Sequence, residues 1–272
     1  SPLVAIIFSM IFGGIFILIA GENPFETYIA MINGSLGSME SILLTLRRTA
    51  PLIVSGLAAS VAFRAGIFNM GIEGSLWVGG LSSALAGIYI SGLPKFVHIP
   101  VALIIGAIIG GFWAIPPVLA YVKYKVDVVV FTLMLNYIAV LIVRYLIRYY
   151  FLDTTRLGLS FAEPETRYIL PSAELPLINS DLNVSIAIII SIALVVLFYF
   201  LFKRTIWGYE NYLTGLNKIF AKYSGIPVQS VVIIAMVLSG ALGGVAGSLD
   251  VLGVHHKFFG RFAIGIGFDG IT

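Results

Sequence analysis

The sequence predicts an all-α polytopic membrane protein, a multi-span helix bundle with one broken or re-entrant segment. Of its 272 residues 59% are apolar and only 11% are charged, whereas soluble domains carry about 45–50% and roughly 25%. Apolar runs of on the order of 20 residues, enough to cross a hydrocarbon core of roughly 30 Å, recur along the chain. The runs lack the alternation over about ten residues that a transmembrane β-barrel shows.

About seven apolar runs are the expected spans. They cover residues 2–20, 49–63, 72–91, 97–122, 126–147, 184–202 and 231–252. The second and third are short and glycine-rich, as is typical of tilted, broken or partly re-entrant segments. Small residues at three- and four-residue spacing, in 106–111 and 239–247, are expected to let helices approach closely. We expect the chain to be cut at both ends, because no basic lead precedes residue 2 and a new segment begins near residue 268.

Lys and Arg in the loops predict which side of the membrane each loop faces. The turn at 121–127 and the loop at 203–226 are basic, whereas the loop at 148–183 carries three arginines against five acidic residues. We therefore expect the first two in the cytoplasm and 148–183 outside. Counting spans backwards places Ser1 inside and residues 21–48 outside, which Arg47 and Arg48 fit badly.

Residues 64–74 are the most informative stretch. Gly66, Gly71 and Gly74 interrupt the helical pattern, and Asn69 and Glu73 fall four residues apart. A broken helix at membrane depth is tolerated only where protein or a water-filled cavity satisfies its backbone. Ionisable groups there usually line a pathway or pair with one another. On spacing alone, a cytoplasmic turn with a solvated Glu73 is an equally good interpretation.

Thr132 and Asn136 lie four residues apart on one face of an otherwise apolar run. In lipid such groups turn inward, and bonding to a neighbouring helix is a commoner use than contact with a polar solute. Trp77 and Phe131 have the rings to stack on a base or a sugar, although packing or lipid contact is the commoner use of such residues.

Residues 217–223 have helical character between Gly215 and Gly225, within the basic 203–226 loop. Such a short helix either rests on the membrane surface or docks a soluble partner.

Asp250, His255 and His256 lack a third ligand at zinc-site spacing, so an interfacial polar turn is the better interpretation. The sequence has no cysteine, no Walker motif and no catalytic constellation, and the scattered charges form no basic stripe for nucleic acid. We therefore expect no catalytic residue and no metal site.

The motifs resemble those of bacterial ABC-importer permeases for nucleosides and simple sugars, in the branched-chain amino acid/ribose permease superfamily. Order and spacing match along nearly the whole chain, in residues 50–56, 63–66, 68–74, 132–137, 207–210, 215–217, 221–226, 238–247, 251–256 and 267–271. The chain departs from the family pattern at Ser75, at Asp250 and at Asn211-Tyr212, and the last change affects the expected docking surface.

The resemblance implies one transmembrane permease domain over 1–272 with an ABC-importer fold, in the bacterial plasma (inner) membrane. It implies a second permease subunit, an ABC ATPase subunit that binds the ATP, and an extracytoplasmic substrate-binding protein, with no cofactor in this chain and no enzyme activity of its own. The expected translocation pathway comprises Asn69, Glu73, Trp77, Phe131, Thr132 and Asn136, and the expected ATPase-coupling residues are Gly208, Gly215, Asn217, Ala221, Gly225 and Ile226.

The implied cargo is a nucleoside, moved inward, with a simple sugar such as ribose or galactose as the alternative. An ion-coupled carrier is the alternative from another class. Such a carrier calls for paired acidic groups in mid-membrane, and Glu73 is the single candidate in the sequence.

Overall fold

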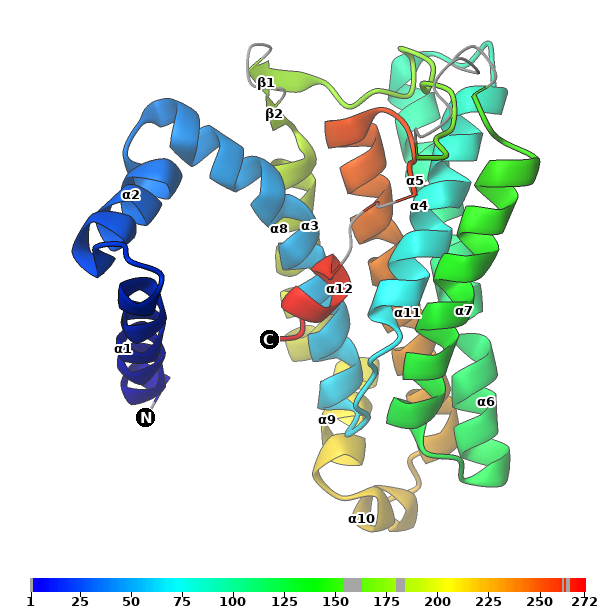
Figure 1. Cartoon of the computed structure of the whole chain (residues 1–272). Coiled ribbons are helices and arrows are strands. Elements are labelled where there is room, and N and C mark those ends of the chain that lie inside the picture. Colours follow the sequence, from blue (N-terminus) through cyan, green and yellow to red (C-terminus); the bar gives the residue numbers. More distant parts are fainter. Residues whose placement is uncertain (1, 154–162, 180–183, 261, 263–264) are drawn as a thin grey trace. The chain divides into compact units, whose positions relative to one another are not determined.

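The computed structural model of the chain (Figure 1) describes residues 2–153, 163–179, 184–260, 262 and 265–272. Part of the predicted 148–183 loop therefore lies outside the described residues. Helices dominate what is described, which confirms the predicted all-α class. The chain divides into two units, Ser1–Leu46 and Arg47–Thr272, and each unit is described by itself.

The first unit contains α1 (Pro2–Ile19) and α2 (Pro24–Leu36). Asn23 caps α2, since its side chain accepts a hydrogen bond from the Phe25 amide, and Pro24 occupies the first turn. The two helices are bent by 116° at their junction, and together they are long and apolar enough to form a broken span or a re-entrant loop. The predicted first span is thus a helix that continues into a second, sharply turned one.

The second unit contains most of the membrane-spanning candidates. Within the described chain, five segments are long and apolar enough to cross a membrane. They are α3 (Met39–Arg64), α5 (Lys95–Trp113) with α6 (Ile115–Tyr124), α7 (Val128–Tyr149), α8 (Ala187–Arg204), and α11 (Val228–Asp250) with the π-helical turn Val251–His255. α3 enters this unit from the first. These helices occupy five of the expected spans.

Helix α4 (Ile72–Tyr89) occupies the expected third span but is less apolar than those five. It packs against α5, α7 and α11, and most of its residues are buried. Figure 1 shows it inside the bundle, with α7 and α11 beside it. Since protein rather than lipid surrounds α4, serine and glycine are tolerated along it, and its mean hydropathy is correspondingly low.

Glycines bring α4, α5 and α11 into backbone contact, as the small-residue spacing predicted. A Cβ atom on Gly110 of α5 would lie 2.6 Å from the Gly240 carbonyl oxygen of α11. Gly244 faces the Gly106 carbonyl oxygen even more closely, and Gly79 of α4 faces Gly244. These contacts leave no room for a side chain, so glycine is a packing requirement at these positions.

Four of the remaining elements lie at the two ends of the bundle (Figure 1). α9 (Ile206–Leu216) and α10 (Lys218–Tyr223) form one end, whereas the antiparallel pair β1 (Leu177–Asn179) and β2 (Val184–Ser185) lies at the other. The short helix predicted at 217–223 is confirmed as α10. α9 was not expected, and it makes most of the 203–226 loop helical. α12 (Ile266–Asp269) is the last element.

Two hydrogen bonds define the ends of the bundle. Lys218 Nζ lies 2.7 Å from the Tyr121 hydroxyl, which joins the 121–127 turn to the α9–α10 loop at what we call the basic end. The Thr166 amide donates to the Phe258 carbonyl at the opposite end. Arg47 also lies at the opposite end, where its Nη2 donates to the Val254 carbonyl at 3.3 Å. A guanidinium is favourable at a helix C-terminus, which explains why this arginine departs from the charge pattern of the loops.

Candidate functional site

The helix break predicted within 64–74 is confirmed. α3 ends at Arg64 and α4 begins at Ile72, and between them Gly66 has a φ of +69°, which favours glycine. Gly66 packs against the turn that ends α9, since a Cβ on Gly66 would lie 3.1 Å from the Gly215 Cα. Lys218 Nζ reaches the Gly66 carbonyl at 3.4 Å. The break is therefore in direct contact with the α9–α10 loop.

Buried asparagines satisfy the backbone of the break. Asn69 Nδ2 donates to Ser239 Oγ at 2.9 Å, and its Oδ1 accepts from the Gly71 amide. Asn136 Oδ1 accepts from the Gly74 amide at 2.9 Å, and its Nδ2 donates to the Met70 carbonyl at 2.7 Å. Asn136 thus binds α7 to the start of α4. The structure favours helix bonding over solute contact for Asn136 in this conformation.

Glu73 and Trp77 form a second network on α4. The Glu73 carboxylate, 5% exposed, accepts from Trp77 Nε1 at 3.2 Å and from the amides of Gly265 at 3.0 Å and Gly267 at 2.7 Å. The Trp77 ring meets the Phe258 ring edge-on at 5.8 Å between centroids. Glu73 is therefore the anchor that holds the chain around α12 against α4. The solvated turn that the sequence left open is excluded for this residue.

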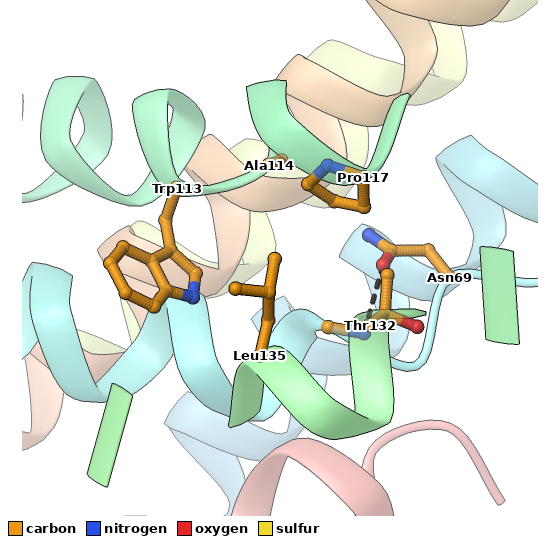
Figure 2. Close-up of a pocket in the computed structure, with 7 residues that line it drawn as sticks. Asn69, Trp113, Ala114, Pro117, Thr132 and Leu135 are labelled. Carbon is orange, nitrogen blue, oxygen red and sulfur yellow. Dashed lines mark hydrogen bonds between the residues drawn. The ribbon is translucent and has the colours of Figure 1, made fainter. Parts of the chain in front are cut away.

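A small cavity lies beside the break (Figure 2). It has a volume of about 10 Å³ and is lined by Asn69, Trp113, Ala114, Pro117, Thr132 and Leu135. This is room for about one water molecule. Trp113 Nε1 is buried without a hydrogen-bond partner in the described part of the chain, and the sequence interpretation missed this residue. A solute does not fit here unless the helices separate.

The expected pathway residues are thus only partly brought together. Asn69 and Thr132 share the small cavity, whereas Glu73 and Trp77 belong to the network around α12. Thr132 Oγ1 donates to the Val128 carbonyl of its own helix at 2.7 Å. Phe131 is half-buried and does not line the small cavity.

The α9–α10 loop has buried supports and an apolar outer surface. Asn217 Oδ1 accepts from the Ile219 and Phe220 amides and so caps α10. Ala221 and Gly208 are buried, and Gly225 has a φ of +84°. Four of the exposed side chains of the loop are large and mainly apolar, namely Leu216, Ile219, Phe220 and Tyr223. The predicted coupling residues therefore shape the loop, and these four form what we call the α10 surface.

A larger cavity of about 590 Å³ lies at the C-terminal end of α7, away from the basic end of the bundle. It is lined by Arg144, Tyr145, Arg148, Tyr149, Glu163 and Gly260. Arg144 Nε donates to the Gly260 carbonyl at 3.0 Å, and its guanidinium lies 5.8 Å from the Trp77 ring centroid. The sequence interpretation did not include this cavity. The available signal was Arg144 itself, a charge close to the end of an apolar run.

No group of three or more His, Cys, Asp or Glu side chains suitable for a metal occurs among the described residues. The Asp250 Oδ2 and His255 Nε2 atoms lie 3.6 Å apart at the end of α11. This pair forms a local polar turn beside Arg47 rather than a cluster of ligands.

Comparison with known proteins identifies the family. A family model described as "Branched-chain amino acid transport system / permease component" matches residues 41–272. The chain belongs to this permease family. Permeases of ABC transporters are transport components rather than enzymes, and this one is a multi-pass protein of the bacterial inner membrane.

Individual relatives extend over the whole chain. The guanosine ABC transporter permease NupP of Bacillus subtilis is 33% identical over 100% of this chain and 77% of its own length. The nucleoside ABC transporter permease NupB of Lactococcus lactis is 32% identical over 100% of this chain and 76% of its own length. The glucose ABC transporter permease TsgB13 of Haloferax volcanii is 27% identical over 100% of this permease and 72% of its own length. No solved structure matches the chain.

Replacing Asn136 with leucine should destabilise the permease by about 1–3 kcal/mol, because the Gly74 amide and the Met70 carbonyl lose their partners. Thermal unfolding of the detergent-solubilised protein measures the effect. Met134→Leu, on an exposed position of the same helix, is the matched control and should unfold at the parental temperature. Equal stability of both variants would mean that water or lipid replaces these bonds at no cost.

Proposed function

We propose that the chain is the permease subunit of an ATP-driven ABC importer that moves nucleosides inward through a pore formed with a second permease. The observation that carries this is the similarity to the guanosine and nucleoside permeases along the entire chain, at higher identity than to the glucose permease. Import of a simple sugar is the weaker alternative. An ion-coupled carrier is disfavoured, since the Glu73 carboxylate is occupied by three N–H donors.

In this proposal the basic end faces the cytoplasm and the α10 surface docks on the ATPase subunit. Its exposed apolar side chains beside Lys218 and Lys222 suit insertion into a groove of a soluble partner. The ATPase binds the ATP, and this chain needs no cofactor. The opposite end, with the 148–183 loop, then receives the substrate-binding protein outside the cell.

The contact between Gly66 and Gly215 suggests how ATP hydrolysis reaches the membrane. A displacement of α10 is transmitted to the break through backbone atoms and through Lys218, because no flexible side chain intervenes between the two glycines. Asn69 and Asn136 form hydrogen bonds around that break, and Thr132 lines the small cavity beside it. We therefore assign them to the pathway as groups that meet solute when the break and α7 separate.

Reconstitution of the intact importer tests the cargo. Proteoliposomes containing the permeases, the ATPase and the binding protein should take up radiolabelled guanosine only with ATP. Excess unlabelled nucleoside should compete, whereas the same excess of ribose or glucose should not. Uptake of sugar alone would favour the alternative, and uptake without ATP would contradict an ABC importer.

Replacing Phe220 with glutamate should reduce ATP-driven uptake by at least about tenfold, because a charge replaces an apolar anchor in the docking contact. Co-purification of the ATPase and uptake in proteoliposomes are the measurements. Phe220 is exposed, so folding should be unaffected, in contrast to the same change at buried Ala221. Tyr124→Glu, exposed at the same end on α6, is the control and should couple normally. Normal coupling of the Phe220 variant would exclude the α10 surface as the docking site.

A further inference from the structure

One face of α7 combines exposure with charge. Tyr137, Leu141, Arg144 and Arg148 recur at the spacing of a single helical stripe. Tyr137 is 75% exposed and Leu141 is 65% exposed, and both arginines are exposed as well. We call this stripe the Arg144 face. Arg144 also contacts Gly260 and Trp77, but all four positions remain exposed in the described part of the chain, although α7 is one of the spanning segments.

Lipid is a poor neighbour for the Arg144 face. Arg144 lies five residues before the end of α7 at Tyr149, or about 7–8 Å along the helix axis. Charged side chains within spans face protein or a water-filled cavity, unless they extend to the interface. Rather than extend to the interface, the Arg144 side chain donates a hydrogen bond to the Gly260 carbonyl, and its guanidinium lies over the Trp77 ring. Water is therefore the medium that suits this face.

The cavity on this face has the size and chemistry of a small-molecule site. Its volume of about 590 Å³ is within the usual range of roughly 300–1,000 Å³. The Tyr145 and Tyr149 rings offer flat faces for stacking, and the two arginines offer N–H donors for the ring nitrogen and carbonyl acceptors of a nucleobase. This combination fits a neutral, planar heterocycle that carries hydroxyl groups.

The cavity is also connected to the interior. The guanidinium of Arg144 lies over Trp77, and Trp77 Nε1 donates to the Glu73 carboxylate at the start of α4. A group bound beside Arg144 is thus separated by one aromatic side chain from the network that holds α12.

We propose that the Arg144 face of α7 is water-filled and lines the translocation path, and that the cavity at its end is where a nucleoside delivered from outside first binds the permease. The proposal rests on the nucleoside-importer function proposed above. It places the first solute contact on the exposed side of α7, before the solute meets Thr132 and Asn136, which are buried on the other side of the helix until α7 and the break separate.

The absence of cysteine from the sequence makes a direct test possible. Leu141→Cys places a single thiol on the Arg144 face, and Leu197→Cys, 55% exposed on α8, is the matched control in a face that should contact lipid. Each variant is treated, in membranes with its intact importer, with a charged, membrane-impermeant methanethiosulfonate. We expect Leu141→Cys to react at least about tenfold faster than the control, because the reagent needs water to reach the thiol. Guanosine together with the binding protein should slow the reaction, and ribose should not.

Three results would overturn all or part of this proposal. A folded Leu141→Cys importer that reacts as slowly as the control would mean that lipid or another subunit covers the face; Tyr145→Cys serves if the first variant does not assemble. Fast reaction without protection by guanosine, in an importer whose parent takes up guanosine, would remove the solute assignment. If the parent takes up only sugar and sugar protects the thiol, the nucleoside function fails while the water-filled face stands.

Discussion

Replacement of Gly244 by leucine should abolish the folded permease. α11 crosses α5 at this position, and a Cβ on Gly244 would overlap the Gly106 carbonyl oxygen and lie 3.1 Å from the Gly110 Cα. Overpacking usually costs about 1–3 kcal/mol. Here the obstructing atoms are backbone on the facing helix, which cannot rotate away, so the cost should exceed that range.

The yield of monodisperse protein in size-exclusion chromatography measures this effect. Gly34→Leu is the matched control, because a Cβ at Gly34 on α2 meets nothing within 4 Å. The control should give the parental yield, and Gly244→Ala should give an intermediate one. A normal yield of Gly244→Leu would mean that α5 and α11 are separated in the native protein.

Replacing Glu73 with leucine should release the chain around α12. The indole of Trp77 and the amides of Gly265 and Gly267 lose their common acceptor. Each buried donor left unpaired costs about 1–3 kcal/mol. Hydrogen exchange of the 265–269 amides should accelerate by at least about tenfold, and we expect nucleoside uptake to fall with it.

Glu73→Gln separates the loss of charge from the loss of acceptors. Glutamine retains one acceptor oxygen, so its exchange rates should lie between those of the parent and of Glu73→Leu. Glu40→Gln, at an exposed position of α3, should leave exchange unchanged. Parental protection in the leucine variant would show that α12 is held by contacts other than Glu73.

Much of the architecture could be predicted from the order of residues. Gly66, Gly71 and Gly74 predicted the break. Gly66 has a positive φ, which favours glycine, whereas Gly71 precedes α4 with a negative φ and Gly74 lies within α4. Asn217 and Gly225 bracket α10 as its cap and its end. The small residues of 106–111 and 239–247 predicted the close approach of α5 and α11. These are local properties, set by one residue and its immediate neighbours along the chain.

Other features depend on residues far apart in the sequence. Glu73 was a candidate pathway group, but its partners Gly265 and Gly267 lie more than 190 positions away. Ala221 was predicted to be an ATPase-coupling residue, and it lies on the buried side of α10, whereas Phe220 and Tyr223 take the exposed positions.

The orientation of α7 shows the physical reason for this division. Helical periodicity predicted Thr132 and Asn136 on one face, and the structure shows Tyr137, Leu141 and Arg144 exposed on another. In a membrane, apolar side chains suit both lipid and protein, so hydropathy does not distinguish a face that packs from a face that is exposed. Local spacing therefore predicted the break, the loop helix and the small-residue contacts. The direction in which α7 turns Asn136 inward followed from its packing against α4 and α6.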